Sequence, residues 1–117
     1  MPASLTIYHN PRCSKSRATL KIIQDAGQEP VVIRYLEEPP DRATLVRLLE
    51  MLDLRPRDLL RRGESVYKVL RLNDSDLTDE ALIDAMLANP VLIERPIVVS
   101  GDQAVIGRPP ENVTALL

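Results

Sequence analysis

The fold of this protein is decided by residues 4–36, which read SLTIYHNPRCSKSRATLKIIQDAGQEPVVIRYL. Polar and apolar side chains alternate over residues 4–8, which predicts a short β-strand. Pro11 disfavours helical geometry in the residue before it, so a loop follows the strand. Apolar side chains then recur at helical spacing, and Gly27 suits the position that ends such a helix. Residues 31–36 are rich in β-branched side chains and predict a second strand, which completes a β-α-β unit.

The middle of the chain, at about residues 41–88, predicts a helical insertion. Asp41 is suited to cap a helix, and the leucines after it repeat at positions i, i+3, i+4 and i+7, on one helix face. These leucines are Leu45, Leu48, Leu49 and Leu52. Shorter helices are expected at about residues 56–60 and 64–70, and a longer helix begins after Thr78.

The last part of the chain predicts a hairpin and a short terminal helix. Residues 97–99 and 104–106 are apolar runs separated by Gly101-Asp102, a dipeptide typical of tight turns. The order of elements is therefore β-α-β, helical insertion, β-β-α. Without the insertion this is the order of the thioredoxin fold, an α/β fold with a mixed sheet and flanking helices. We expect one thioredoxin-like domain over residues 1–117.

Composition and charge exclude several classes of protein. A net charge of −2 argues against nucleic-acid binding, which normally needs a strongly basic domain. No stretch approaches the roughly 18 consecutive apolar residues of a membrane helix, and residues 1–12 lack the pattern of a secretory leader. The single cysteine excludes an intrachain disulfide and a four-cysteine zinc site, and no metal is expected. We expect a cytoplasmic location, where free thiols persist.

Cys13 is the candidate nucleophile. It stands where the first helix is expected to begin, so unpaired backbone N–H groups and the positive end of the helix dipole favour its thiolate. Arg12, Lys15 and Arg17 add positive charge around it. The alternative is a small buried side chain without a chemical role, the commoner fate of a lone cysteine.

Two polar residues near Cys13 are candidate supports for a thiolate. His9 is the only histidine, four residues upstream, and could act as a cation or hydrogen-bond donor, although a purely structural hydrogen bond is an equal alternative. Ser16 forms a Cys-x-x-Ser pattern, in which its hydroxyl can bond a thiolate but cannot resolve a disulfide. The arginine of a phosphatase loop would stand six residues after the cysteine, where this chain has Thr19. A phosphatase-type loop is therefore not expected.

Several segments together resemble the ArsC family of glutaredoxin-coupled arsenate reductases. The run YHNPRCSKSR at residues 8–17 resembles the active-site signature of that family, and YLEEPP at residues 35–40 resembles its second strand. ERPIVV at residues 94–99 and GRP at residues 107–109 resemble its third strand and final loop. LLRR at residues 59–62 and LTD at residues 77–79 resemble parts of its helical insertion.

The resemblance implies a reaction. Cys13 would attack arsenic and form a covalent thiol–arsenate adduct, glutathione would then attack, and glutaredoxin would supply the resolving thiol before arsenite leaves. The reduction takes two electrons and one thiol cannot form an internal disulfide, so the second thiol must come from outside. Arsenate, glutathione and glutaredoxin are the implied partners, without a bound cofactor, nucleic acid or membrane.

The resemblance also assigns an oxyanion site. The family's three arginines map by motif onto Arg61, Arg95 and Arg108. Arsenate and a thiolate repel one another, so guanidinium groups are needed to offset that repulsion. Pro96 matches the position of the cis-proline that faces the cysteine in thioredoxin-like folds, and we expect a cis bond before it.

Two other functions remain possible from the sequence. One is a monothiol, glutathione-dependent reductase of mixed disulfides or of another oxyanion. The other is an Spx-type regulator, which shares the fold and binds RNA polymerase. Ser16 replaces the second cysteine of that regulator's redox switch, and the three arginines are present, so the reductase is favoured.

Overall fold

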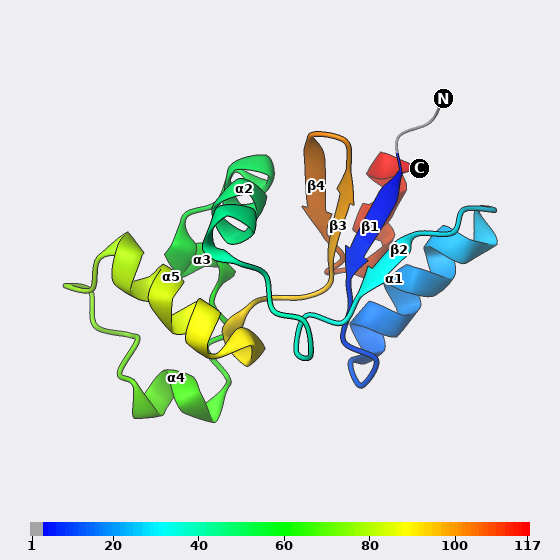
Figure 1. The fold of residues 1–117 in the computed structure, drawn as a ribbon. Helices are drawn as coiled ribbons and strands as arrows, with labels where there is room; N and C mark the ends of the chain where they lie inside the picture. Colours follow the sequence, from blue (N-terminus) through cyan, green and yellow to red (C-terminus); the bar gives the residue numbers. More distant parts are fainter. Residues whose placement is uncertain (1–3) are drawn as a thin grey trace. The chain divides into compact units, whose positions relative to one another are not determined.

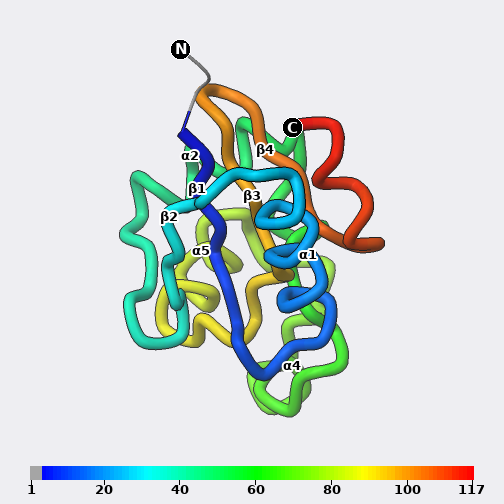
Figure 2. The backbone as a smooth tube through the Cα atoms, turned by 90° about the vertical axis from the view of Figure 1, so that its right-hand side faces the viewer, coloured from blue at the N-terminus to red at the C-terminus, as the bar shows by residue number. Residues whose placement is uncertain are grey.

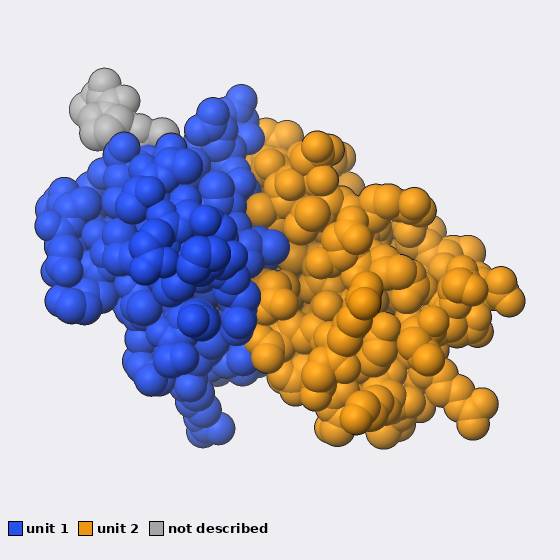
Figure 3. All heavy atoms as spheres, turned by 180° about the vertical axis from the view of Figure 1, so that it is seen from behind, with its two compact units in different colours: residues 1–38, 95–117 blue, residues 39–94 orange. Residues whose placement is uncertain are grey.

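The computed structural model describes residues 4–117, which divide into two compact units (Figure 3). One unit contains the chain up to Glu38 together with Arg95–Leu117, and the other is Pro39–Glu94. The predicted insertion at about residues 41–88 falls within the second unit. A single domain over residues 1–117 stays a prediction. Residues 1–3, which belong to that domain and to the N-terminal segment in which no secretory leader is expected, lie outside the described part.

The first unit is built on a four-stranded mixed sheet (Figure 1). The strand order is β2-β1-β3-β4, in which β1 pairs parallel with β2, and β3 runs antiparallel to both β1 and β4. The strands are β1 (Leu5–Tyr8), β2 (Val31–Ile33), β3 (Ile97–Ser100) and β4 (Gln103–Ile106). The parallel pair with its crossover helix and the antiparallel hairpin form the predicted thioredoxin-like sheet.

One face of this sheet is covered by α1 (Ser14–Asp25) and the 3₁₀ helix η2 (Pro110–Leu116), which Figure 2 shows on the same side of the strands. Alternate strand residues point to that side, because successive side chains of a strand face opposite ways. The core is formed by Leu5, Ile7, Ile23, Val98 and Val113, each at most 4% exposed. The apolar faces of α1 and of the sheet therefore bury one another.

The second strand is shorter than predicted. It ends at Ile33 rather than continuing to residue 36. The Arg34 carbonyl accepts hydrogen bonds from the amides of Glu37 and Glu38, at 2.9 and 2.8 Å, which turns the chain away from the sheet. The hairpin turn agrees with prediction, since Gly101 adopts a φ of +61°, a conformation that glycine tolerates.

The second unit is helical, as predicted. Its elements are α2 (Arg42–Leu52), α3 (Pro56–Leu59), α4 (Ser65–Val69), α5 (Asp79–Ala88) and the 3₁₀ turn η1 (Pro90–Leu92). Asp41 caps α2, where its carboxylate accepts the Thr44 amide at 2.8 Å, and the hydrogen bonds from Thr44 hold the pKa of that carboxyl below its usual value. Within residues 4–117, none of the helices has the length and apolar character needed to cross a lipid bilayer.

Replacing Thr78 with Ala should lower the free energy of unfolding by about 1 kcal/mol. The Thr78 hydroxyl accepts the Ala81 amide at 3.1 Å and so satisfies one of the free N–H groups at the start of α5. Urea denaturation followed by circular dichroism measures the change. Thr78→Ser keeps the acceptor and is the matched control; an equal loss in both variants would show that the cap is not the cause.

Candidate active site

Cys13 caps the first turn of α1. Its backbone is extended, with φ −94° and ψ 123°, while its carbonyl already accepts the Arg17 amide at 3.0 Å. The loop before it is braced because the Cys13 amide donates to the Asn10 carbonyl and the Arg12 amide donates to Asn10 Oδ1, each at 3.0 Å. The thiol therefore stands at the start of the helix, as expected, and is 8% exposed.

Arg108 approaches the sulfur from the loop after β4. Its Nη2 donates to Cys13 Sγ at 3.6 Å, and its Nε donates to the Arg95 carbonyl at 2.8 Å. The second bond fixes the angle at which the guanidinium meets the sulfur. The structure thus brings together two predicted residues that lie 95 positions apart in the chain.

Arg95 belongs to the same cluster through its backbone. Nε and Nη1 of its guanidinium are shielded from solvent. The bond between Arg95 and Pro96 is cis, as predicted, and the bond between Arg108 and Pro109 is also cis, which was not predicted.

Arg61 lies in the other unit and is bound by carboxylates there. Its Nε is 3.2 Å from Glu64 Oε1, and its Nη1 is 3.4 Å from Glu94 Oε1. Its amide donates to the Leu92 carbonyl at 2.8 Å, which ties it to the chain segment before Arg95. An anion would have to compete with both carboxylates for this guanidinium, and its participation in a site with Cys13 stays a prediction.

His9 and Ser16 form a buried pair beside the loop. The Ser16 hydroxyl lies 2.6 Å from His9 Nδ1 and accepts the Asn10 amide at 3.0 Å. Burial, followed by the positive charges of Arg34 and Arg17, lowers the pKa of His9 below its usual 6.5. A neutral ring can accept a hydrogen bond from the Ser16 hydroxyl at Nδ1. The pair therefore links the loop at His9 and Asn10 to the first turn of α1. Support of the Cys13 thiolate by either residue stays a prediction.

Gly107 was not among the predicted site residues, yet it stands next to Arg108 at a close contact with α1. A methyl group on its α-carbon would lie 2.4 Å from Thr19 Oγ1 and 2.9 Å from Pro96 Cγ. Thr19 is fully buried in α1, and its hydroxyl donates to the Lys15 carbonyl at 2.8 Å. Only a glycine lets the loop after β4 lie this close to α1. The sequence feature that could have revealed this contact is the glycine of the GRP motif at residues 107–109.

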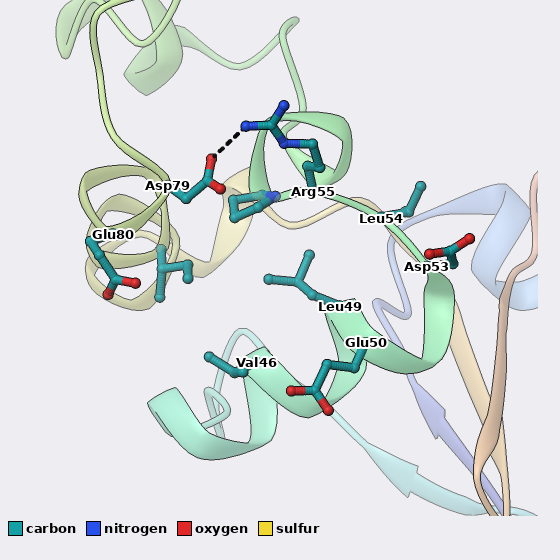
Figure 4. Close-up of a pocket in the computed structure, with 10 residues that line it drawn as sticks. Val46, Leu49, Glu50, Asp53, Leu54, Arg55, Asp79 and Glu80 are labelled. Carbon is teal, nitrogen blue, oxygen red and sulfur yellow. Dashed lines mark ion pairs between the residues drawn. The ribbon is translucent and has the colours of Figure 1, made fainter.

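A separate cleft of about 350 Å³ lies in the helical unit, between α2, α3 and α5 (Figure 4). Leu49 and Val46 line its apolar part, and an ion pair of 3.6 Å joins Arg55 to Asp79 at its edge. Within residues 4–117, no group of three or more histidine, cysteine or acidic side chains is arranged to hold a metal ion. None of the residues that line this cleft was predicted to carry chemistry.

Comparison with known proteins identifies relatives along the whole chain. The model of the ArsC family matches residues 8–116. The arsenate reductase of Acidiphilium multivorum is 46% identical over 115 residues, which cover 98% of this chain and 82% of that protein. The protein of Escherichia coli K12 called uncharacterized protein YfgD is 53% identical over 118 residues, covering 100% and 99%. A structure described as an arsenate reductase from Vibrio cholerae matches with a TM-score of 0.96 at 50% identity, covering all of both chains.

The pKa of His9 should be measured below 6.5 in the folded protein. Because it is the only histidine, its ring resonances can be followed by NMR without ambiguity. Below pH 6.5 the unfolded chain takes up a proton that the folded chain resists, so stability should fall from about pH 6.5 and level off below the folded pKa.

His9→Asn is the matched variant, because its amide can still meet Ser16 but does not titrate. It should remove the slope of stability against pH in this range. An unchanged slope would mean that His9 titrates normally and that the loss comes from other groups.

Gly107→Ala should destabilise the protein by about 1–3 kcal/mol, since the new methyl overlaps Thr19 and Pro96. It should also slow alkylation of Cys13 by iodoacetamide at pH 7, because the displaced guanidinium of Arg108 would no longer donate to Cys13 Sγ.

Gly63→Ala is the control, because a methyl there meets nothing within 4 Å. The second substitution Thr19→Ala removes the Thr19 atoms that clash and should restore part of both losses. Normal alkylation in Gly107→Ala would contradict the role assigned to this close contact.

Proposed function

Since this chain belongs to the ArsC family, we propose that it is an arsenate reductase in which Cys13 is the nucleophile. Two relatives described as arsenate reductases are 46% and 50% identical to this chain over nearly its whole length, which supports this activity. Cys13 would attack arsenic(V), form a sulfur–arsenic bond and displace one arsenate oxygen as hydroxide or water.

The observation that carries the proposal is the hydrogen bond from Arg108 Nη2 to Cys13 Sγ. The bond places a cationic side chain at the sulfur, and the thiolate is the nucleophilic form of cysteine. The same guanidinium has further N–H groups, which can donate hydrogen bonds to an oxyanion that arrives at the sulfur. One side chain can thereby reduce the repulsion between thiolate and arsenate.

Arg95 and Arg61 are proposed to complete the anion site. The Arg95 carbonyl holds Arg108 at 2.8 Å, so the two residues are structurally coupled. Arg61 would exchange its contacts with Glu64 and Glu94 for the arsenate oxygens. His9 and Ser16 contribute by holding the loop that presents Cys13.

Two thiols from outside the chain are proposed to finish the reaction. Reduction of arsenic(V) to arsenic(III) takes two electrons, which two thiols supply as they become one disulfide. The chain has one cysteine, and that residue must be released unchanged for the next turnover. We assign these thiols to glutathione and glutaredoxin, which act in a reducing compartment such as the cytoplasm.

The test is an assay coupled to NADPH oxidation with glutathione, glutathione reductase and glutaredoxin, run with and without arsenate. The wild-type protein should show oxidation that depends on arsenate, and Cys13→Ser should lose it. If NADPH oxidation depended on a glutathione mixed disulfide but not on arsenate, the protein would instead be a monothiol reductase of disulfides.

Arg95→Lys and Arg108→Lys should each lower kcat/KM for arsenate by about tenfold, because a lysine keeps the charge but cannot form two parallel hydrogen bonds. Arg47→Lys is the control, since Arg47 is well exposed on α2 and 3.8 Å from Glu50. Full activity in both site variants would remove these arginines from the anion site.

A further inference from the structure

We propose that a second cleft, beside the Cys13 loop, binds the α-amino-acid end of the small thiol co-substrate, the γ-glutamyl group of glutathione. This inference rests on the proposed function, because it concerns the thiol that follows arsenate. The cleft lies wholly within the first unit and has a volume of about 230 Å³. It is lined by His9, Asn10, Pro11, Arg12, Arg34, Leu36 and Glu37.

The position of the cleft suits a thiol donor. One wall is the loop at residues 9–12, which ends directly at Cys13. The other wall is the turn after β2, where the Arg34 carbonyl accepts the amides of Glu37 and Glu38. A ligand held here is anchored next to the loop that presents the sulfur.

The charges in the cleft are not used within the chain. Among the described residues, neither Arg12 nor Arg34 lies within ion-pair distance of a carboxylate, and both side chains are exposed. Arg17, Arg57, Arg62 and Arg71 are likewise outside ion-pair distance of a carboxylate in the described part of the chain, so Arg12 and Arg34 are set apart by lining one cleft together. Two unpaired guanidinium groups that line one cleft, in a protein of net charge −2, favour a site for an external anion.

The third charged group selects the kind of anion. Glu37 lines the same cleft and forms no ion pair in the described part of the chain. Two cations and one carboxylate together complement a group that carries a carboxylate and an ammonium on one carbon. An inorganic oxyanion would gain nothing from Glu37 and would be repelled by it.

The size of the cleft limits how much of the ligand enters it. Its volume is below the roughly 300–1,000 Å³ of sites that enclose a drug-sized molecule. One end of a tripeptide fits, which leaves its thiol outside. Leu36 supplies an apolar wall for the methylene groups of a γ-glutamyl chain. The positive charge of Arg34 acts on His9, which also lines the cleft, and after burial it contributes to the lowered pKa of that ring.

The test uses S-methylglutathione, which cannot react, so binding is measured without arsenate turnover. Addition to the wild-type protein should shift the His9 ring resonances in NMR spectra to saturation. Arg34→Gln and Glu37→Gln should each raise the dissociation constant, by roughly tenfold for the arginine. Arg47→Gln, on the helical unit, should leave it unchanged.

Two shortened ligands locate the contact. γ-Glutamyl-S-methylcysteine keeps the amino-acid end and should remain sensitive to Arg34→Gln. N-acetyl-S-methylcysteinylglycine lacks that end, and its weaker binding should no longer respond to the substitution. The opposite pattern would overturn the proposal by assigning the cleft to the glycine carboxylate.

Other outcomes would also overturn it. An unchanged dissociation constant in Arg34→Gln, measured on a protein with a wild-type amide spectrum, would exclude the cleft. If substitution of Arg34 or Glu37 reduced turnover with glutaredoxin but left S-methylglutathione binding unchanged, these charges would be assigned to binding glutaredoxin instead of glutathione. If the ligand binds as expected but arsenate is not reduced, the proposed function fails and the cleft assignment stands.

Discussion

The contact between Gly107 and Thr19 is the constraint on which the candidate site depends. It presses the loop after β4 onto the side of α1, one residue before Arg108. The helix contributes Cys13 at its start, and the hairpin contributes Arg108 at its end. Because protein interiors are closely packed, a single methyl group at this contact would displace one of the two. Packing at the residue next to Arg108 therefore helps to position its guanidinium at the sulfur.

Two groups of arginines serve the loop that presents Cys13. Arg95 lies just before β3 and Arg108 just after β4; Arg108 donates to the sulfur, and the Arg95 carbonyl holds Arg108 in place. Arg12 and Arg34 lie around the neighbouring cleft, where no carboxylate of the described chain pairs with them. Separate cationic sites would let arsenate and a charged thiol approach the same loop without competing for one binding group.

The regular elements were largely predictable because their signals are local. Asp41 and Thr78 accept the amides of the first helical turns, as their residue types favour, and Gly101 takes the positive φ of the hairpin turn. The second strand was overextended because Arg34, Tyr35 and Leu36 match a strand in composition. Its actual end is decided by the carbonyl of Arg34, which bonds to the amides of Glu37 and Glu38.

The sequence by itself determined the order of the elements and the start of a helix at Cys13, because propensity, capping and periodicity act over a few residues. Its motifs also led to the prediction of Arg61, Arg95 and Arg108 as an anion site before any geometry was known. Only the tertiary structure decided that Arg108 reaches the sulfur, that Arg61 is held by Glu64 and Glu94, and that Arg12 and Arg34 share a cleft. These contacts join residues far apart in the chain, and their distances follow from how strands and helices pack rather than from any local pattern.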